Sequence, residues 1–282
     1  MGFFYSLLEW LPFSWAQPGG MYFMKNALWA ILIIAPLFGI LSTMVVTSRM
    51  SFFSDALGHS AFTGIAVGAV CGLANPLPVA IACSVVFALL FTLVEQRSSF
   101  SSDTIIGVFS ATAVALGIFV STMNGGSFSR FNALLIGDIL SVTPNQLLLL
   151  ALVLLAVLLL WFFSLNQMML SSVHPVLAKS RNVGVFWQRA LFSAAIAIVV
   201  TVSMTWIGLM VINSLLVLPA AAARNLSRNL RQYHLFSLLF ALVAGLAGLF
   251  TSYYVGASTG AAITLYLALF FAVGFVFRRV RQ

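Results

Sequence analysis

Residues 190–223 read ALFSAAIAIVVTVSMTWIGLMVINSLLVLPAAAA and contain no Asp, Glu, Lys or Arg. Basic residues flank this run: Lys179, Arg181 and Arg189 before it, and Arg224, Arg228 and Arg231 after it. Because cations concentrate on the cytoplasmic side of membrane proteins, both ends of the run are expected in the cytoplasm. The run must then cross the membrane twice, in two short or broken segments that meet near residues 206–208.

The composition of the whole chain supports a membrane protein. Hydrophobic residues make up 62% of the sequence and charged residues 6%, against about 25% charged residues in soluble domains. Further uncharged runs cover 26–48, 104–129, 139–178 and 232–277, and one membrane-spanning helix needs about 20 apolar residues. We therefore predict an all-α, polytopic helical bundle with eight or nine transmembrane helices, some short or broken, forming a single domain over residues 1–282.

The basic residues also predict the topology. The expected spans are 27–47, 57–72, 76–94, 104–122, 146–165, two within 190–223 and two within 232–277. Arg278, Arg279 and Arg281 place the C-terminus in the cytoplasm. The aromatic segment within residues 1–24 is expected to lie in the membrane interface, and no basic region precedes Lys25 to indicate a cleaved signal. The net charge of +8 follows membrane sidedness, so we expect a lipid bilayer and no nucleic acid as partner.

One ionisable pair stands out within residues 49–72, RMSFFSDALGHSAFTGIAVGAVCG. Asp55 and His59 are four residues apart and therefore share one helix face. Carboxylate oxygen and imidazole nitrogen suit divalent Zn, Mn or Fe better than Cu(I). An Asp at the centre of a membrane costs about 2.5–3.5 kcal/mol and so often marks a transport path. The alternative is a helix start, with Ser54 or Asp55 capping backbone amides; spacing alone does not separate the two.

Small residues in the same region predict close helix packing. Gly64, Gly68 and Gly72 recur at every fourth position, a spacing that lets helix backbones approach closely. The two cysteines of the chain, Cys71 and Cys83, lie in apolar surroundings and are interpreted as packing residues.

The stretch 215–232, LLVLPAAAARNLSRNLRQ, is expected to end a span and become amphipathic. Pro219 should break or kink the helix. Arg224, Arg228 and Arg231 then share one face, and Leu226 and Leu230 lie on another. We predict a short cytoplasmic helix over 221–232 that couples to a partner protein, or that contacts anionic lipid headgroups.

The remaining acidic and histidine residues are expected to be structural. Asp103 should lie in a helix-start region, Asp138 in an external vestibule or cap, and Glu95 in a loop ion pair with Arg97. The default for the other two histidines, His174 and His234, is a solvated surface position.

The nucleotide-binding motif for ATP hydrolysis and the zinc-dependent hydrolase motif are missing from the sequence. The chain has two lysines, Lys25 and Lys179, and neither follows a glycine, so no Walker A loop is present. The HExxH motif of zinc-dependent hydrolases is also absent. We therefore expect a transport subunit that is not itself an enzyme. A stand-alone secondary transporter or cation channel that uses Asp55 is the alternative.

Several segments together resemble a known family. RMSFFSDALGHSAFTGIAVG resembles the signature of the membrane permeases of zinc- and manganese-type ABC importers, the ABC-3 family. Four later segments resemble family motifs in the same order: SSDTIIGVFSATAVALGIFV, LLIGDILSV, WIGLMVINSLLVLPAAAARNL and YYVGASTGAAITLYLALFF. The resemblance covers about residues 27–277.

This resemblance implies one of two identical subunits in a bacterial inner membrane. It further implies a separate cytoplasmic ATP-binding subunit, an external metal-binding protein, and zinc or manganese (or iron) as transported ion with no permanently bound cofactor. Asp55 and His59 would line the path, and 221–232 would form the coupling helix. Two departures from the family pattern are Gly58, where Ser is common, and Thr259, where Pro is usual; Thr259 is expected to loosen the last turn.

Overall fold

The computed structural model describes residues 20–123, 139–173, 175–181 and 184–281, together with 17 and 137. The regular elements of this part of the chain are all helices. They are α2 (Tyr22–Thr47), α3 (Phe53–Val70), α4 (Leu77–Arg97), α5 (Ser102–Thr122), the 3-10 helix η1 (Ile139–Ser141), α7 (Pro144–Val173), α8 (Pro175–Ser180), α9 (Val185–Ile207), α10 (Leu209–Leu226), α11 (Leu230–Val255) and α12 (Thr259–Arg281). The interfacial segment predicted within residues 1–24 lies almost entirely outside the described residues, as do Asp138 and His174.

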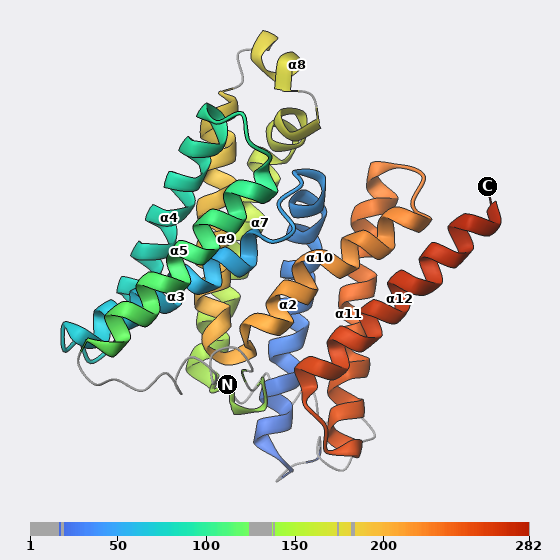
Figure 1. The fold of residues 1–282 in the computed structure, drawn as a ribbon. Coiled ribbons are helices and arrows are strands. Elements are labelled where there is room, and N and C mark those ends of the chain that lie inside the picture. Colours follow the sequence, from blue (N-terminus) through green and yellow to red (C-terminus); the bar gives the residue numbers. More distant parts are fainter. Residues whose placement is uncertain are drawn as a thin grey trace.

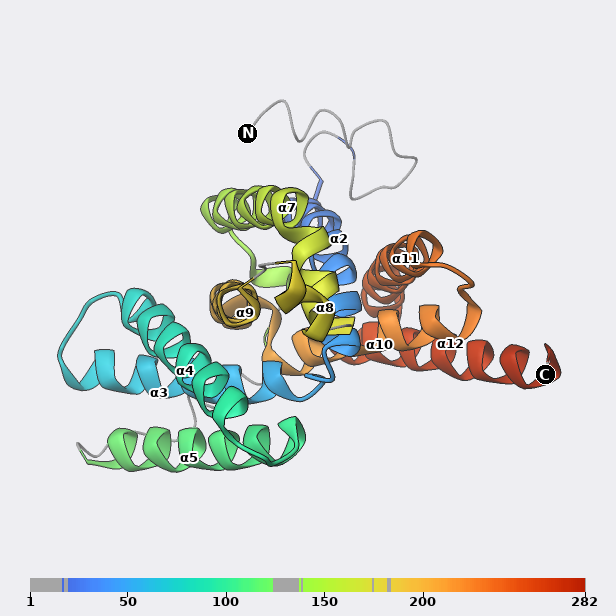
Figure 2. The same cartoon turned by 90° about the horizontal axis from the view of Figure 1, so that it is seen from above.

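Three groups of helices make up the bundle (Figures 1 and 2). Helices α2, α7 and α9 stand in the middle, α3, α4 and α5 form one side, and α10, α11 and α12 form the other. α2 packs against α7, α10 and α11, whereas α3 packs against α4, α5, α9 and α10. Both α3 and α10 therefore join a side group to the remainder of the molecule.

Eight of the described helices are long and apolar enough to cross a membrane, which confirms a polytopic helical membrane protein. The ninth long helix, α3, does not belong to that set, because Asp55, His59 and several Ser and Gly residues lower its hydropathy. The predicted turn near 206–208 corresponds to Gly208, where α9 ends and α10 begins. Pro219 lies inside α10 and does not end it.

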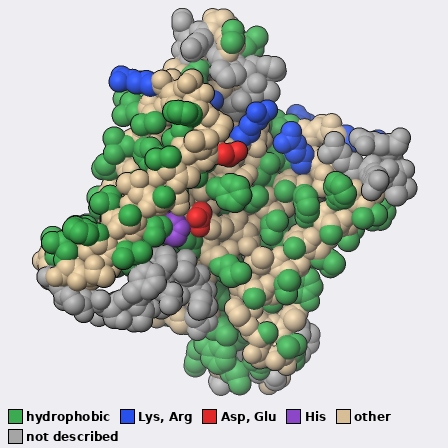
Figure 3. Space-filling model, viewed as in Figure 1, with side chains coloured by type: hydrophobic (Ala, Val, Ile, Leu, Met, Phe, Trp, Pro, Cys, Tyr) green, Lys and Arg blue, Asp and Glu red, His purple; other side chains and the backbone are tan. Residues whose placement is uncertain are grey.

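Basic side chains gather toward one end of the molecule. On the face drawn in Figure 3 they lie in the upper part, near the level at which α10 turns into α11 in Figure 1. The positive-inside rule identifies this upper end as cytoplasmic.

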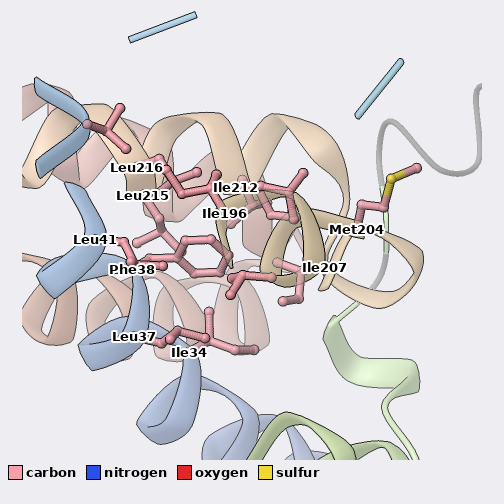
Figure 4. Close-up of a cluster of buried hydrophobic side chains, with 14 of the residues drawn as sticks. Ile34, Leu37, Phe38, Leu41, Ile196, Met204, Ile207, Ile212, Leu215 and Leu216 are labelled. Atoms are coloured by element: carbon pink, nitrogen blue, oxygen red, sulfur yellow. The ribbon is translucent and has the colours of Figure 1, made fainter. Parts of the chain in front are cut away.

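The centre of the fold is a cluster of buried hydrophobic side chains between α2, α9 and α10 (Figure 4). Its side chains are fully buried or nearly so. They include Ile34, Leu37, Phe38 and Leu41 of α2, Ile196, Met204 and Ile207 of α9, and Ile212, Leu215 and Leu216 of α10. In a bilayer such close packing, rather than exclusion from water, holds helices together.

Polar contacts join α2 to α11. The Ser42 and Ser237 hydroxyls lie 2.8 Å apart, and Ser237 also donates to the Gly39 carbonyl at 2.7 Å. The Thr43 hydroxyl lies 2.8 Å from Nδ1 of His234. The expectation of a solvated surface position for His234 is therefore wrong: its imidazole is half-buried and bonded to the neighbouring helix.

Gly64 and Gly68 lie against α4. A β-carbon on Gly64 would come within 2.5 Å of the Ala80 Cα, and one on Gly68 within 2.9 Å of Pro76 Cβ. Gly72 differs from the prediction, because α3 ends at Val70 and Gly72 has nothing within 4 Å of its β position. Its φ of 71° instead requires glycine for the turn into α4.

The segment 221–232 is not one continuous helix. α10 ends at Leu226, and α11 begins at Leu230. The Asn229 side chain accepts from the Gln232 backbone N–H at 2.8 Å, while Gln232 Oε1 accepts from the Arg228 N–H at 3.0 Å. These reciprocal bonds, similar to a capping box, start a new helix at this point. Residues 227–229 consequently form a turn between two membrane-spanning helices.

Hydrogen bonds hold the start of α12 in place, although the sequence predicted a loosened turn there. The Thr259 hydroxyl lies 2.7 Å from the Ser252 hydroxyl, and Ser252 also donates to the Ala257 carbonyl at 2.6 Å. Gly256, with a φ of 72°, closes α11 in the left-handed conformation. Threonine in place of the usual proline therefore ties α11 to α12 instead of loosening the turn.

An unusual backbone conformation follows α2. Arg49 has a φ of 58° and is the only non-glycine with positive φ in the part of the chain described. Its N–H bonds the Val46 carbonyl at 3.3 Å, and the Met50 N–H bonds the Val45 carbonyl at 3.0 Å. This is the hydrogen-bond pattern of a Schellman motif, whose left-handed residue is usually glycine. A side chain at such a position costs about 1–2 kcal/mol.

The close approach of α3 and α4 predicts a marked effect of one methyl group. Gly64→Ala is expected to destabilise the protein by about 1–3 kcal/mol, because the two helix backbones must separate. Gly107→Ala in α5 is the matched control, since nothing lies within 4 Å of its β position. Thermal unfolding in detergent, followed by tryptophan fluorescence, should show a lower midpoint for Gly64→Ala only. Equal midpoints for the two variants would contradict close α3–α4 packing at Gly64.

Candidate metal site

Helix α3 brings Asp55 and His59 together. Asp55 lies in the first turn of α3 and His59 one turn later, so that Asp55 Oδ2 and His59 Nε2 are 3.3 Å apart. The imidazole is largely buried, with 14% of the side chain exposed, whereas 40% of the Asp55 side chain is exposed. His59 is therefore the shielded residue of the pair, and Asp55 is open to an approaching ligand.

The pair lies away from the basic end of the molecule. In Figure 3 an acidic side chain contacts a histidine at about the middle height, and a second acidic side chain lies above it beside basic residues. The contact between a histidine and a carboxylate among the described residues is that of Asp55 with His59. Although α3 follows a cytoplasmic turn, its polar pair is thus displaced toward the centre of the bundle.

A third polar side chain holds Asp55 from another helix. Nδ2 of Asn213 in α10 donates to Asp55 Oδ1 at 3.0 Å. Asn213 was not among the residues singled out from the sequence. The signal was available, because an amide inside the apolar run LMVINSLLVLP is a costly polar group in a membrane helix.

The contacts of Asp55 test the alternative that it caps the backbone amides at the start of α3. The N-cap residue of α3 is Phe52, and no side chain caps its amides. The two carboxylate oxygens of Asp55 instead contact His59 and Asn213. Asp55 also lies close to the partial positive charge at the start of the helix. Asp55 is accordingly not an N-cap.

Glycine at position 58 permits the contact between α3 and α10. A β-carbon on Gly58 would overlap the side chain of Leu209, the first residue of α10. Leu209 is 2% exposed and fills this space. The departure from the usual serine therefore allows Leu209 to pack closely against α3, one helical turn before Asn213.

The pair offers few ligands from a single copy of the chain. No group of three or more His, Cys, Asp or Glu side chains able to hold a metal ion occurs among the described residues. Tetrahedral zinc ligands at about 2.1 Å from the ion lie about 3.4 Å apart. The 3.3 Å between Asp55 Oδ2 and His59 Nε2 therefore matches two neighbouring ligand positions of such an ion. Further ligands must come from water or from elsewhere.

Glu95 differs from the prediction made for it. Its carboxylate pairs with Arg189 of α9 at 3.3 Å, not with Arg97, and it accepts from the Ser102 hydroxyl at 2.6 Å. This ion pair joins α4 to α9, and both of its residues lie far from Asp55 in the sequence. Asp103, in the first turn of α5, is exposed, and the neighbouring Ser101 is the residue that caps that helix.

The residues predicted to couple to a partner surround the turn at 227–229. Arg224 and Leu226 belong to the last turn of α10, Arg228 to the turn itself, and Leu230 and Arg231 to the start of α11. Arg224, Arg228, Leu230 and Arg231 are exposed, and Leu226 is half-buried. Asn213 and this turn belong to the same helix, so that α10 connects the Asp55 contact to the cytoplasmic end.

The chain is similar to known proteins along most of its length. The high-affinity zinc uptake system membrane protein ZnuB of Buchnera aphidicola is 29% identical over 81% of this chain and 87% of its own. The manganese import system permease protein ScaB of Streptococcus gordonii is 28% identical over 90% and 91%. The solved structure of PsaBC from Streptococcus pneumoniae in complex with Fab matches with a TM-score of 0.77 and 27% identity, covering 97% and 95% of the two chains.

The family assignment covers nearly the whole chain. A model of the ABC 3 transport family matches residues 20–278, which include every described membrane-spanning helix up to the start of the final basic segment. The chain therefore belongs to the ABC 3 transport family.

Proposed function

We propose that two copies of this chain form the membrane path of an ATP-driven importer of zinc or manganese. As a member of its family the chain is a transport subunit, and a separate subunit hydrolyses ATP. Relatives that match over most of their length are named as zinc and manganese import proteins. The observation that carries the proposal is the Asp55–His59 pair held by Asn213.

The ligands of the pair suit a transported ion more than a stored one. An incoming divalent cation would replace the contact between Asp55 and His59 with bonds to both side chains, exchanging part of its water shell. Two protein ligands are fewer than the four of a structural zinc site, so the ion stays partly hydrated and is readily released. Conduction requires this balance between entry and exit.

The shortage of ligands supports a homodimer. A two-fold axis beside α3 would bring a second Asp55 and His59 to the ion and complete a site of four side chains. An external metal-binding protein would supply the ion, and movement of the cytoplasmic turn at 227–229 would change the access of the site. Because α10 joins that turn to Asn213, a shift of α10 would move Asp55 directly.

Removal of the charge at Asp55 tests the metal path. Asp55→Asn keeps the size of the side chain and one acceptor oxygen, but it removes the charge and weakens cation binding; we expect uptake of radioactive zinc or manganese to fall at least about tenfold. Asp103→Asn, an exposed carboxyl group on α5, is the matched control and should leave uptake unchanged. Both are measured in cells with the ATP-binding and metal-binding partners at equal membrane expression. Normal uptake by Asp55→Asn would reject the pair as the path.

Asn213 is expected to position Asp55 for the ion. Asn213→Ala removes a hydrogen bond to a charged group, which is worth about 1.5–3 kcal/mol, so the KM for metal uptake should rise about tenfold or more. Ser214→Ala on the same helix is the control, since the Ser214 hydroxyl bonds Met210 and Thr264 instead. A variant with unchanged KM and reduced maximal rate would contradict a positioning role at the site.

A mixture of subunits tests the shared path. Wild-type and Asp55→Asn chains, produced in equal amounts, assemble at random into dimers. If the ion needs both copies, about one quarter of the dimers remain active and uptake falls to that fraction. If each copy contains its own path, uptake falls to about one half, which would contradict the homodimeric site.

A further inference from the structure

A basic hollow opens among the cytoplasmic helix ends. It has a volume of about 660 Å³, and residues of the α2–α3 turn, α4, α9, α10 and α11 line it. Four arginines contribute to its wall: Arg49, Arg189, Arg224 and Arg228. On the face drawn in Figure 3, basic side chains lie around an acidic one in this upper part of the molecule. We call this surface the arginine hollow.

Most of the positive charge in the hollow is not neutralised. Glu95 is the one carboxylate among the lining residues, and it is already engaged by Arg189 and Ser102. Arg49, Arg224 and Arg228 form no ion pair within the part of the chain that the structure describes, and all three are exposed. Guanidinium groups that converge without counter-ions in a concave surface create a strong positive potential.

Arg49 lines the hollow from a strained backbone conformation. It occupies the left-handed position of the Schellman motif after α2, where glycine fits better. The Arg49 guanidinium has no ionic partner within the part of the chain that the structure describes. Backbone strain of this kind concentrates at functional sites, and here it points to a ligand outside the chain.

We propose that the arginine hollow receives an acidic segment of the ATP-binding subunit, with Arg49 as an anchor; this inference rests on the proposed function. The hollow adjoins the turn at 227–229 on the cytoplasmic side, where such a subunit docks. Planar guanidinium groups bind carboxylates through paired hydrogen bonds. A walled hollow suits a protruding helix end or loop with two or three Asp or Glu side chains better than a flat layer of headgroups.

Arg49→Gly separates this role from a structural one. Glycine accepts the positive φ, so the permease alone should unfold at an equal or higher temperature. The affinity of the purified ATP-binding subunit from the same organism for the variant in detergent should fall about tenfold or more. The dependence of that affinity on salt should also weaken, because salt screens the lost ion pairs. Arg181→Gly removes an exposed arginine from a cytoplasmic turn outside the hollow and should change neither quantity.

Three results would overturn the proposal. The first is wild-type affinity and salt dependence in Arg49→Gly, and the second is an equal loss in Arg181→Gly. The third is a loss that appears only in nanodiscs with anionic lipid, which would assign the hollow to lipid headgroups. If the wild-type permease itself failed to bind the ATP-binding subunit, the proposed importer function would fail instead.

Discussion

The hydrogen bond from Asn213 to Asp55 connects the two parts of the molecule that we propose to act in transport. It joins α3, which carries the ionisable pair, to α10, which runs to the cytoplasmic turn. Within a membrane a carboxylate needs partners, because no bulk water is available to satisfy it. The packing of Leu209 into the space at Gly58 brings the two helices close enough for this bond.

The same contact gives a physical basis for coupling. From Asn213 to the end of α10 at Leu226 the helix extends about 20 Å, at 1.5 Å per residue. In the proposed mechanism, α10 transmits a displacement of its cytoplasmic end to the carboxylate. Pro219 lies within this part of α10 and leaves one backbone hydrogen bond unmade, which makes it the place where the helix bends most easily.

Charge is distributed along the chain according to two requirements. The middle of the bundle contains the pair of Asp55 and His59, whose side chains suit a divalent cation. The cytoplasmic end carries arginines in excess, and Glu95, whose side chain is 9% exposed, neutralises one of them. We propose that the first arrangement receives a cation and that the second provides an electrostatic surface for an acidic protein, on the side where the positive-inside rule expects cations.

The sequence by itself determined the helical fold, the approximate spans and the Asp55–His59 pair, because hydropathy and i, i+4 spacing act within single helices. It also predicted that the basic clusters lie toward one end of the molecule. The tertiary structure decided the role of Asn213, which lies 158 residues from Asp55, the pairing of Glu95 with Arg189, and the burial of His234. It also decided that the helix predicted over 221–232 is interrupted at 227–229, and that Gly72 lies in a turn instead of a helix contact. These features depend on which helices become neighbours, and helix packing in a membrane follows side-chain shape, which periodicity and composition do not encode.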